Sequence, residues 1–216
     1  MFVPDTFGLA MLMMITSAVC WGSWANTYKA TKGYRFELFY WDYAVGIFLV
    51  SLIYAFSLGS SGSTGEGFLE NVKAADTGNI VSAMIGGFIF NVANLLLVAA
   101  IDLAGLAVAF PVAIGIAMVV GVIMSYALQP KGDALLLAVG VALAIVAVIL
   151  DGKAYGRLSK GGQAVSRKSI IVCIVSGVLM GSFAPFVTRA LTNGHPLTPY
   201  SIAVFFTLEA GLCCFV

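Results

Sequence analysis

The chain has 216 residues, of which 61% are hydrophobic, and only 11 are Lys or Arg and 10 are Asp or Glu. A soluble domain carries about 25% charged residues, so a charged fraction of 10% with a mean hydropathy of +1.02 excludes one. A net charge of +1 without polar low-complexity sequence also excludes a nucleic-acid binder and a disordered chain. The composition predicts a protein that crosses a membrane several times.

Seven apolar stretches are long enough to cross a bilayer. They cover residues 8–28, 39–58, 79–101, 103–128, 134–150, 169–188 and 199–216. Stretches such as 135–150 are apolar on every face, which favours helices over the alternating strands of a membrane barrel. Of all the charged residues, only Asp42 and Glu209 lie inside these spans. The sequence therefore predicts an all-α, polytopic membrane helix bundle.

Basic residues are concentrated in alternate connections. The first, third and fifth connections together hold eight Lys and Arg, whereas the second, fourth and sixth hold three. Because basic connections stay in the cytoplasm, this bias predicts an N-terminus on the outside. The start of the chain lacks the basic stretch of a signal peptide, so we expect the first span to remain in the mature protein.

A short motif recurs at an offset of 159 residues, as Gly22-Ser23-Trp24-Ala25 and Gly181-Ser182-Phe183-Ala184. Five spans separate the two copies, and an odd number of crossings inverts the second copy. We expect residues 1–150 to form a first five-helix repeat, 151–168 a cytoplasmic linker and 169–216 the start of a second repeat. The chain would then be a fragment of a ten-span protein. The alternative is that the two motifs are merely similar packing surfaces.

Asp42 is the first candidate for chemistry, because an ionisable residue within a span indicates function. A carboxyl group there could bind and release a proton as a cavity opens to either side. The alternative is an interfacial carboxylate that pairs with Lys32 or Arg35 beside aromatic residues of the membrane surface.

Polar and aromatic residues in the first three spans supply donors, acceptors and stacking faces for a neutral polar solute. The candidate substrate-binding residues are Trp24, Asn26, Tyr43, Asn91 and Asn94. The alternative is that the amides only hydrogen-bond neighbouring helices.

Three further patterns concern the packing of the helices. Residues 68–76 follow a Gly/Ser-rich connection and predict a short helix at the membrane surface. Asp102 is expected to form the sharp turn between the third and fourth spans and to cap a helix there, and the alternative is that it lines the pathway. After Pro111, the small residues Ala113, Ala117 and Gly121 recur every four positions, which predicts a closely packed neighbouring helix.

The sequence has no phosphate-binding loop, catalytic triad or metal-ligand motif, so we expect neither an enzyme nor a cofactor.

Short segments across the chain are similar to those of one transporter group. They are Gly22-Ser23-Trp24, Trp41-Asp42-Tyr43, Phe68-Leu69, Gly86-Gly87 with Asn94, Gly105-Leu106 and Tyr200. The sequence thereby resembles the drug/metabolite transporter superfamily, and within it the plant ureide permeases and the bacterial glucose/ribose porters. The resemblance implies ten helices in two inverted repeats, a central site and proton-coupled uptake of a small neutral polar solute. It matches Asp42 to the family's Asp-Tyr pair and Asn94 to its third-span asparagine.

The connection at 156–168 is short, whereas plant ureide permeases carry a long hydrophilic loop. This departure favours a bacterial-type member and a sugar over a ureide. We therefore expect a transporter of a bacterial plasma membrane that takes up a sugar with a proton or another cation as its partner. The alternatives are a ureide or nucleobase importer, an exporter of drugs or metabolites with the same fold, and a structural or sensory membrane subunit that transports nothing.

Overall fold

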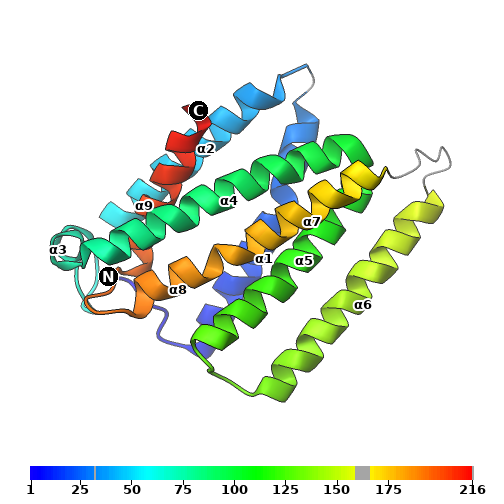
Figure 1. Cartoon of the computed structure of the whole chain (residues 1–216). Helices are drawn as coiled ribbons and strands as arrows, with labels where there is room; N and C mark the ends of the chain where they lie inside the picture. The colour runs from blue at the N-terminus through cyan, green and yellow to red at the C-terminus, as the bar shows by residue number, and fades with distance from the viewer. Residues whose placement is uncertain (32, 159–165, 216) are drawn as a thin grey trace.

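The computed structural model describes residues 1–31, 33–158 and 166–215, and the regular structure of these residues is entirely helical (Figure 1). In chain order the α-helices are α1 (Phe7–Ala30), α2 (Phe36–Phe56), α3 (Phe68–Ala74), α4 (Thr77–Ala104), α5 (Leu106–Leu128), α6 (Ala134–Leu158), α7 (Arg167–Ser182), α8 (Ala184–Thr192) and α9 (Pro199–Leu212). A short 3₁₀-helix, η1 (Cys213–Phe215), follows α9. The predicted all-α class is confirmed.

The predicted spans correspond to α1, α2, α4, α5, α6, the α7–α8 pair and α9. Within the described part of the chain, six of these segments are long and apolar enough to cross a membrane, and α9 is a shorter apolar helix. The protein is therefore a polytopic membrane helix bundle. The predicted division into two repeats stays a prediction.

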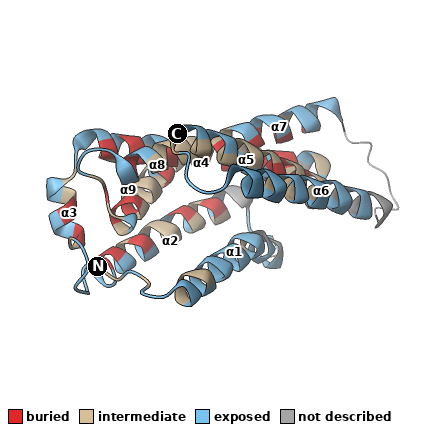
Figure 2. Ribbon diagram, turned by 90° about the horizontal axis from the view of Figure 1, so that it is seen from below, coloured by how far each residue is buried: buried red, intermediate tan, exposed pale blue. Residues whose placement is uncertain are grey.

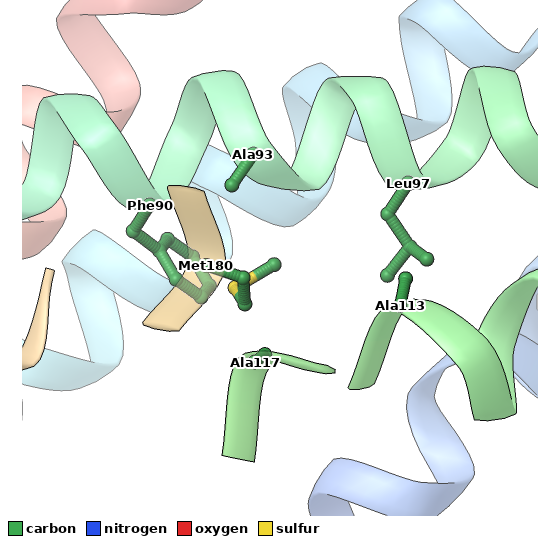
Figure 3. Packing of buried hydrophobic residues seen from close by; sticks show 6 residues of the cluster. All are labelled: Phe90, Ala93, Leu97, Ala113, Ala117 and Met180. Carbon is green, nitrogen blue, oxygen red and sulfur yellow. The ribbon is translucent and has the colours of Figure 1, made fainter. Parts of the chain in front are cut away.

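The centre of the bundle lies where α4 meets α5 and α7. Phe90, Ala93 and Leu97 of α4 pack against small residues of α5 and against Met180 of α7 (Figure 3). The small residues are Ala113 and Ala117, the first two members of the predicted stripe. Their size lets three helix backbones approach one another, as is usual where lipid removes most of the hydrophobic drive for association.

Helices α5 and α7 also approach each other closely. A Cβ atom added to Gly177 would lie 2.6 Å from the carbonyl oxygen of Ala113, and one added to Gly181 would lie 2.7 Å from that of Ala117. Both distances are too short for a real Cβ contact, so only glycine fits at these two positions. The predicted packing role of the stripe is confirmed, and α5 runs unbroken through Pro111.

The helices α1 and α6 lie at the edges of the bundle and are largely exposed (Figure 2). None of the spanning window of α1 or α6 is buried, whereas 44% of the window of α4 is. Their exposed large hydrophobic residues are mostly Leu, Ile, Val and Met. Such apolar surfaces suit contact with lipid or with further membrane helices rather than with water.

The turn between the third and fourth spans is not at Asp102. Helix α4 continues to Ala104, and the chain turns at Gly105 with φ +79°. Glycine adopts this left-handed conformation without the steric cost of a Cβ atom, whereas aspartate does so less readily. The prediction that Asp102 forms the turn is therefore wrong.

The predicted sixth span is divided in two. Helix α7 ends at Ser182 and α8 begins at Ala184, with Pro185 in the first turn of α8. Proline has no N–H to donate to the preceding turn, so the hydrogen-bond ladder is interrupted here. In addition, α6 extends through the first residues of the predicted linker to Leu158, and residues 159–165 of that linker lie outside the described chain.

The predicted helix after the Gly/Ser-rich connection is confirmed as α3. Asn71 of α3 is buried and ties two connections together. Its Nδ2 donates to Glu66 Oε2 and to the carbonyl of Pro196, both at 3.0 Å, and its Oδ1 accepts from the N–H of Thr198 at 2.8 Å. The α2–α3 connection is thus fastened to the start of α9, on the side of the bundle where the N-terminus lies (Figure 1).

Candidate functional site

A buried polar contact joins α2 to α4 deep within the bundle. Tyr40 of α2 donates its hydroxyl to Asn91 Oδ1 and accepts from Asn94 Nδ2 at 3.1 Å. Asn91 and Asn94 lie three residues apart, so both side chains lie on the same face of α4. Tyr40 is 4% exposed, Asn91 1% and Asn94 2%. Because an unpaired amide in such a place is costly, these hydrogen bonds fix the three side chains relative to one another.

Aromatic rings continue from this contact toward α1. The ring of Tyr43 lies 5.7 Å from that of Tyr40, one turn away on α2. The ring of Tyr43 also stacks on Trp24 of α1, with ring centroids 5.5 Å apart and an interplanar angle of 29°. Tyr43 and Trp24 are half-buried, which leaves part of their ring surface open to a ligand.

We call Trp24, Tyr40, Tyr43, Asn91 and Asn94 the aromatic–amide cluster. Four of them are predicted substrate-binding residues, and α1, α2 and α4 bring them together. Tyr40 is the member that sequence reasoning missed, although its spacing of three from Tyr43 places both on one helix face. The aromatic faces and carboxamides together can stack on a planar solute and hydrogen-bond its edges.

Asn26, the remaining predicted binding residue, is exposed. It lies two residues after Trp24, about 200° further around an α-helix, and therefore on another face of α1. The structure does not bring Asn26 to the cluster, and its role in binding stays a prediction.

Asp42 lies near the beginning of α2 and is exposed. Its Oδ2 accepts a hydrogen bond of 2.6 Å from the hydroxyl of Tyr34, which precedes the helix. This bond stabilises the neutral phenol beside a carboxylate and raises the pKa of Tyr34 above its ordinary value. Of the basic partners considered for Asp42, Lys32 lies outside the described residues. The position suits a carboxylate at the end of a span, and its role in proton coupling stays a prediction.

Three phenylalanine rings pack together next to the cluster. Phe90 of α4 lies 5.6 Å from Phe183, the residue between α7 and α8, and 5.2 Å from Phe206 of α9. Phe90 is adjacent to Asn91 in the chain and one turn before Asn94. The interruption of the sixth span therefore places Phe183 beside Phe90, the residue that precedes the cluster's Asn91 on α4.

A cavity of about 600 Å³ lies between the N-terminal segment, α2 and α9. Its α2 wall runs from Gly46 to Tyr54, so it begins within one helical turn of Tyr43. Apolar side chains form nearly all of this wall, and the cavity lacks the paired polar groups that the cluster provides. Within the described chain, no group of three or more His, Cys, Asp or Glu side chains could hold a metal ion.

The sequence profile of the ureide permeases matches residues 39–188, more than two thirds of the chain. The chain belongs to the ureide permease family. Tyr40, Tyr43, Asn91 and Asn94 lie inside the matched region, while Trp24 precedes it.

Two curated plant relatives are similar over 156 residues, which is 69% of this chain. Ureide permease 2 of Arabidopsis thaliana is 29% identical over that stretch, and ureide permease 4 of the same plant is 28% identical. The aligned stretch covers 39% of either relative, so the chain spans well under half of their length. No solved structure matches the chain.

Proposed function

We propose that the protein is a secondary active permease that carries a small neutral polar solute of the ureide class across a membrane. The observation that carries the proposal is the aromatic–amide cluster, four of whose members lie in the region matched by the ureide permease family. A transporter must recognise its solute within the bilayer, and this cluster supplies polar groups at that depth.

The chemistry of the cluster suits a ureide. A ureide contains planar urea groups, each with a carbonyl acceptor and N–H donors on one edge. The carboxamide of asparagine offers the complementary pair, one acceptor and an NH₂ donor. The faces of Trp24 and Tyr43 can stack on the same planar group. A sugar, preferred from the short connection at 156–168, can also use these groups, but the family match favours the ureide.

We also propose that uptake is coupled to protons and that Asp42 is one of the carboxyl groups that bind and release them. The concentration of basic residues in alternate connections supports an N-terminus on the outer side of the membrane, and the short connection at 156–168 supports a bacterial plasma membrane. Uptake would proceed by alternating access, in which the helices around the cluster open to one side of the membrane at a time.

The test is uptake by the full-length protein in proteoliposomes with an imposed pH gradient. We expect a radiolabelled cyclic ureide such as hydantoin to accumulate, and glucose not to accumulate. Accumulation that survives a protonophore would contradict proton coupling. Uptake of glucose but of no ureide would favour the sugar assignment, and loss of preloaded ureide against its gradient would favour an exporter.

A second candidate is a structural membrane subunit, because the contacts of Tyr40 with the two asparagines also hold α2 and α4 together. Equilibrium binding distinguishes it from a permease: a structural subunit binds neither hydantoin nor glucose, whereas a permease binds its solute even without a gradient.

A further inference from the structure

Glu209 is an acidic residue in the last turn of an apolar helix. It lies ten residues after Pro199, the first residue of α9. At 1.5 Å per residue, this spacing places it about 15 Å along the helix, which is half of a hydrocarbon layer of about 30 Å. The side chain is half-buried. Asp42, in contrast, lies within two turns of the beginning of its helix.

The surroundings of Glu209 offer it a weak donor in place of a cation. The thiol of Cys213, one turn further along, donates to Glu209 Oε1 at 3.8 Å. Among the described residues, no Lys, Arg or His side chain forms an ion pair with Glu209. An ion pair between His195 and Glu66 lies near the start of α9, at the opposite end of this helix from Glu209. An ionised carboxylate at this depth without a cation is strongly disfavoured in lipid.

The thiols and phenols near the end of α9 are neutral at physiological pH. Cys213 and Cys214 belong to η1, and Tyr40 and Tyr43 belong to α2, which packs along α9. On α4, the other main neighbour of α9, the amide of Asn91 contacts Cys214 of η1. Thiols and phenols lose their protons only at alkaline pH, so none of these groups offsets a charge on Glu209.

The 3₁₀-helix η1, which follows α9, also contacts the aromatic–amide cluster. Asn91 Nδ2 lies 3.9 Å from the sulfur of Cys214 and donates to it. Gly87 of α4 faces Phe206 of α9 so closely that a Cβ atom there would overlap the carbonyl oxygen of Phe206. Glu209 therefore lies on a helix that fits tightly against α4. Cys214, which follows this helix in η1, contacts Asn91.

We propose that Glu209 is a proton-binding carboxyl group that couples proton movement to solute binding at the cluster. Lipid surroundings favour the neutral, protonated form of Glu209. When the carboxyl group ionises, α9 shifts against α4, and this shift alters the hydrogen bonding of Asn91. Glu209 thus acts in the middle of the bilayer, and Asp42 nearer the end of a span. The inference rests on the proposed transport function.

Chemical labelling tests proton binding independently of transport. Dicyclohexylcarbodiimide reacts with protonated carboxyl groups in apolar surroundings and leaves a stable N-acylurea that mass spectrometry locates. In the full-length protein we expect Glu209 to be labelled. Glu70, an exposed residue of α3, should remain unlabelled. Absence of label on Glu209 at every pH would overturn the proposal.

Transport provides the second arm. We expect the Glu209→Gln variant to lose gradient-driven accumulation of hydantoin, to the level of wild type treated with a protonophore, while hydantoin counterflow persists. The Glu70→Gln variant is the matched control and should accumulate hydantoin like wild type. Full accumulation by Glu209→Gln would overturn the coupling role. If wild type moves no ureide, the proposed function fails, and the labelling result still decides whether Glu209 binds a proton.

Discussion

The hydroxyl of Tyr40 and the amide of Asn94 share a hydrogen bond of 3.1 Å that crosses from α2 to α4. The same hydroxyl donates to Asn91, so one oxygen atom serves as donor and acceptor between two buried amides. This arrangement orients both asparagines and leaves their remaining hydrogen-bonding capacity for a solute. It also explains why a tyrosine, rather than a phenylalanine, is needed at this buried position.

The first prediction concerns this hydroxyl. Tyr40→Phe removes it and leaves two buried amides with a partner missing, which should lower stability by about 1 to 2 kcal/mol. Thermal unfolding of the detergent-solubilised protein, followed by tryptophan fluorescence, measures the change. Tyr54→Phe, an exposed tyrosine on the same helix, is the control. Equal melting temperatures for the two variants would show that the hydroxyl contributes nothing to the packing of α2 against α4.

The second prediction concerns the approach of α5 and α7. Gly181→Ala places a methyl group against Ala117 and Val120, so we expect a destabilisation of about 1 to 3 kcal/mol from overpacking. Gly140→Ala on α6 is the matched control, because a Cβ atom there meets nothing within 4 Å. The melting temperatures of the two variants provide the measurement. A Gly181→Ala protein as stable as Gly140→Ala would mean that the two helices lie further apart.

The third prediction concerns Asn71, which fastens the α2–α3 connection to the start of α9. Asn71→Ala removes three hydrogen bonds of a buried amide and should cost about 1 to 3 kcal/mol. Limited proteolysis should then cleave the connection faster. Lys73→Ala, at an exposed position of the same short helix, should change neither stability nor cleavage. Unchanged proteolysis of Asn71→Ala would contradict the fastening role.

The fourth prediction concerns Asp42. Asp42→Asn should abolish proton-driven accumulation of hydantoin by the full-length protein while leaving exchange, since an amide cannot release a proton. Unchanged accumulation would restrict Asp42 to an interfacial role.

The same variant has a pH signature at Tyr34. The hydrogen bond to Asp42 raises the pKa of Tyr34, so this bond persists in mildly alkaline solution and is lost as the pH rises through that raised value. Without the carboxylate, Tyr34 should ionise at a lower pH than in wild type, which the absorbance of tyrosinate reports. An identical titration would show that the contact is absent in solution.

The sequence predicts the spans well because a bilayer imposes a simple rule of length and charge. Residues 134–150 are apolar throughout, and a spanning helix covers them. The division of the sixth span is harder to predict. Pro185 lies within a continuous apolar run, and proline is tolerated in membrane helices when neighbours satisfy the backbone, so its effect depends on tertiary packing.

The turn at Gly105 shows a second limit. A charged residue marks the end of an apolar run, which points to Asp102, but the backbone turns where a positive φ is available.

The aromatic–amide cluster shows a third limit of prediction from the sequence. Trp24, Tyr43, Asn91 and Asn94 are recognisable as polar or aromatic residues within spans, whereas Tyr40 resembles an ordinary aromatic of the membrane surface. Its role emerges only when α2 and α4 lie side by side.

Equilibrium binding of radiolabelled hydantoin to the solubilised full-length protein tests the account most directly. We predict that wild type binds hydantoin more tightly than glucose. Asn94→Ala and Trp24→Ala should each weaken hydantoin binding by about tenfold, since each removes about 1.4 kcal/mol of interaction. Asn193→Ala, in an exposed connection, should bind like wild type. Hydantoin binding that is unchanged in both cluster variants would contradict the assignment of the site.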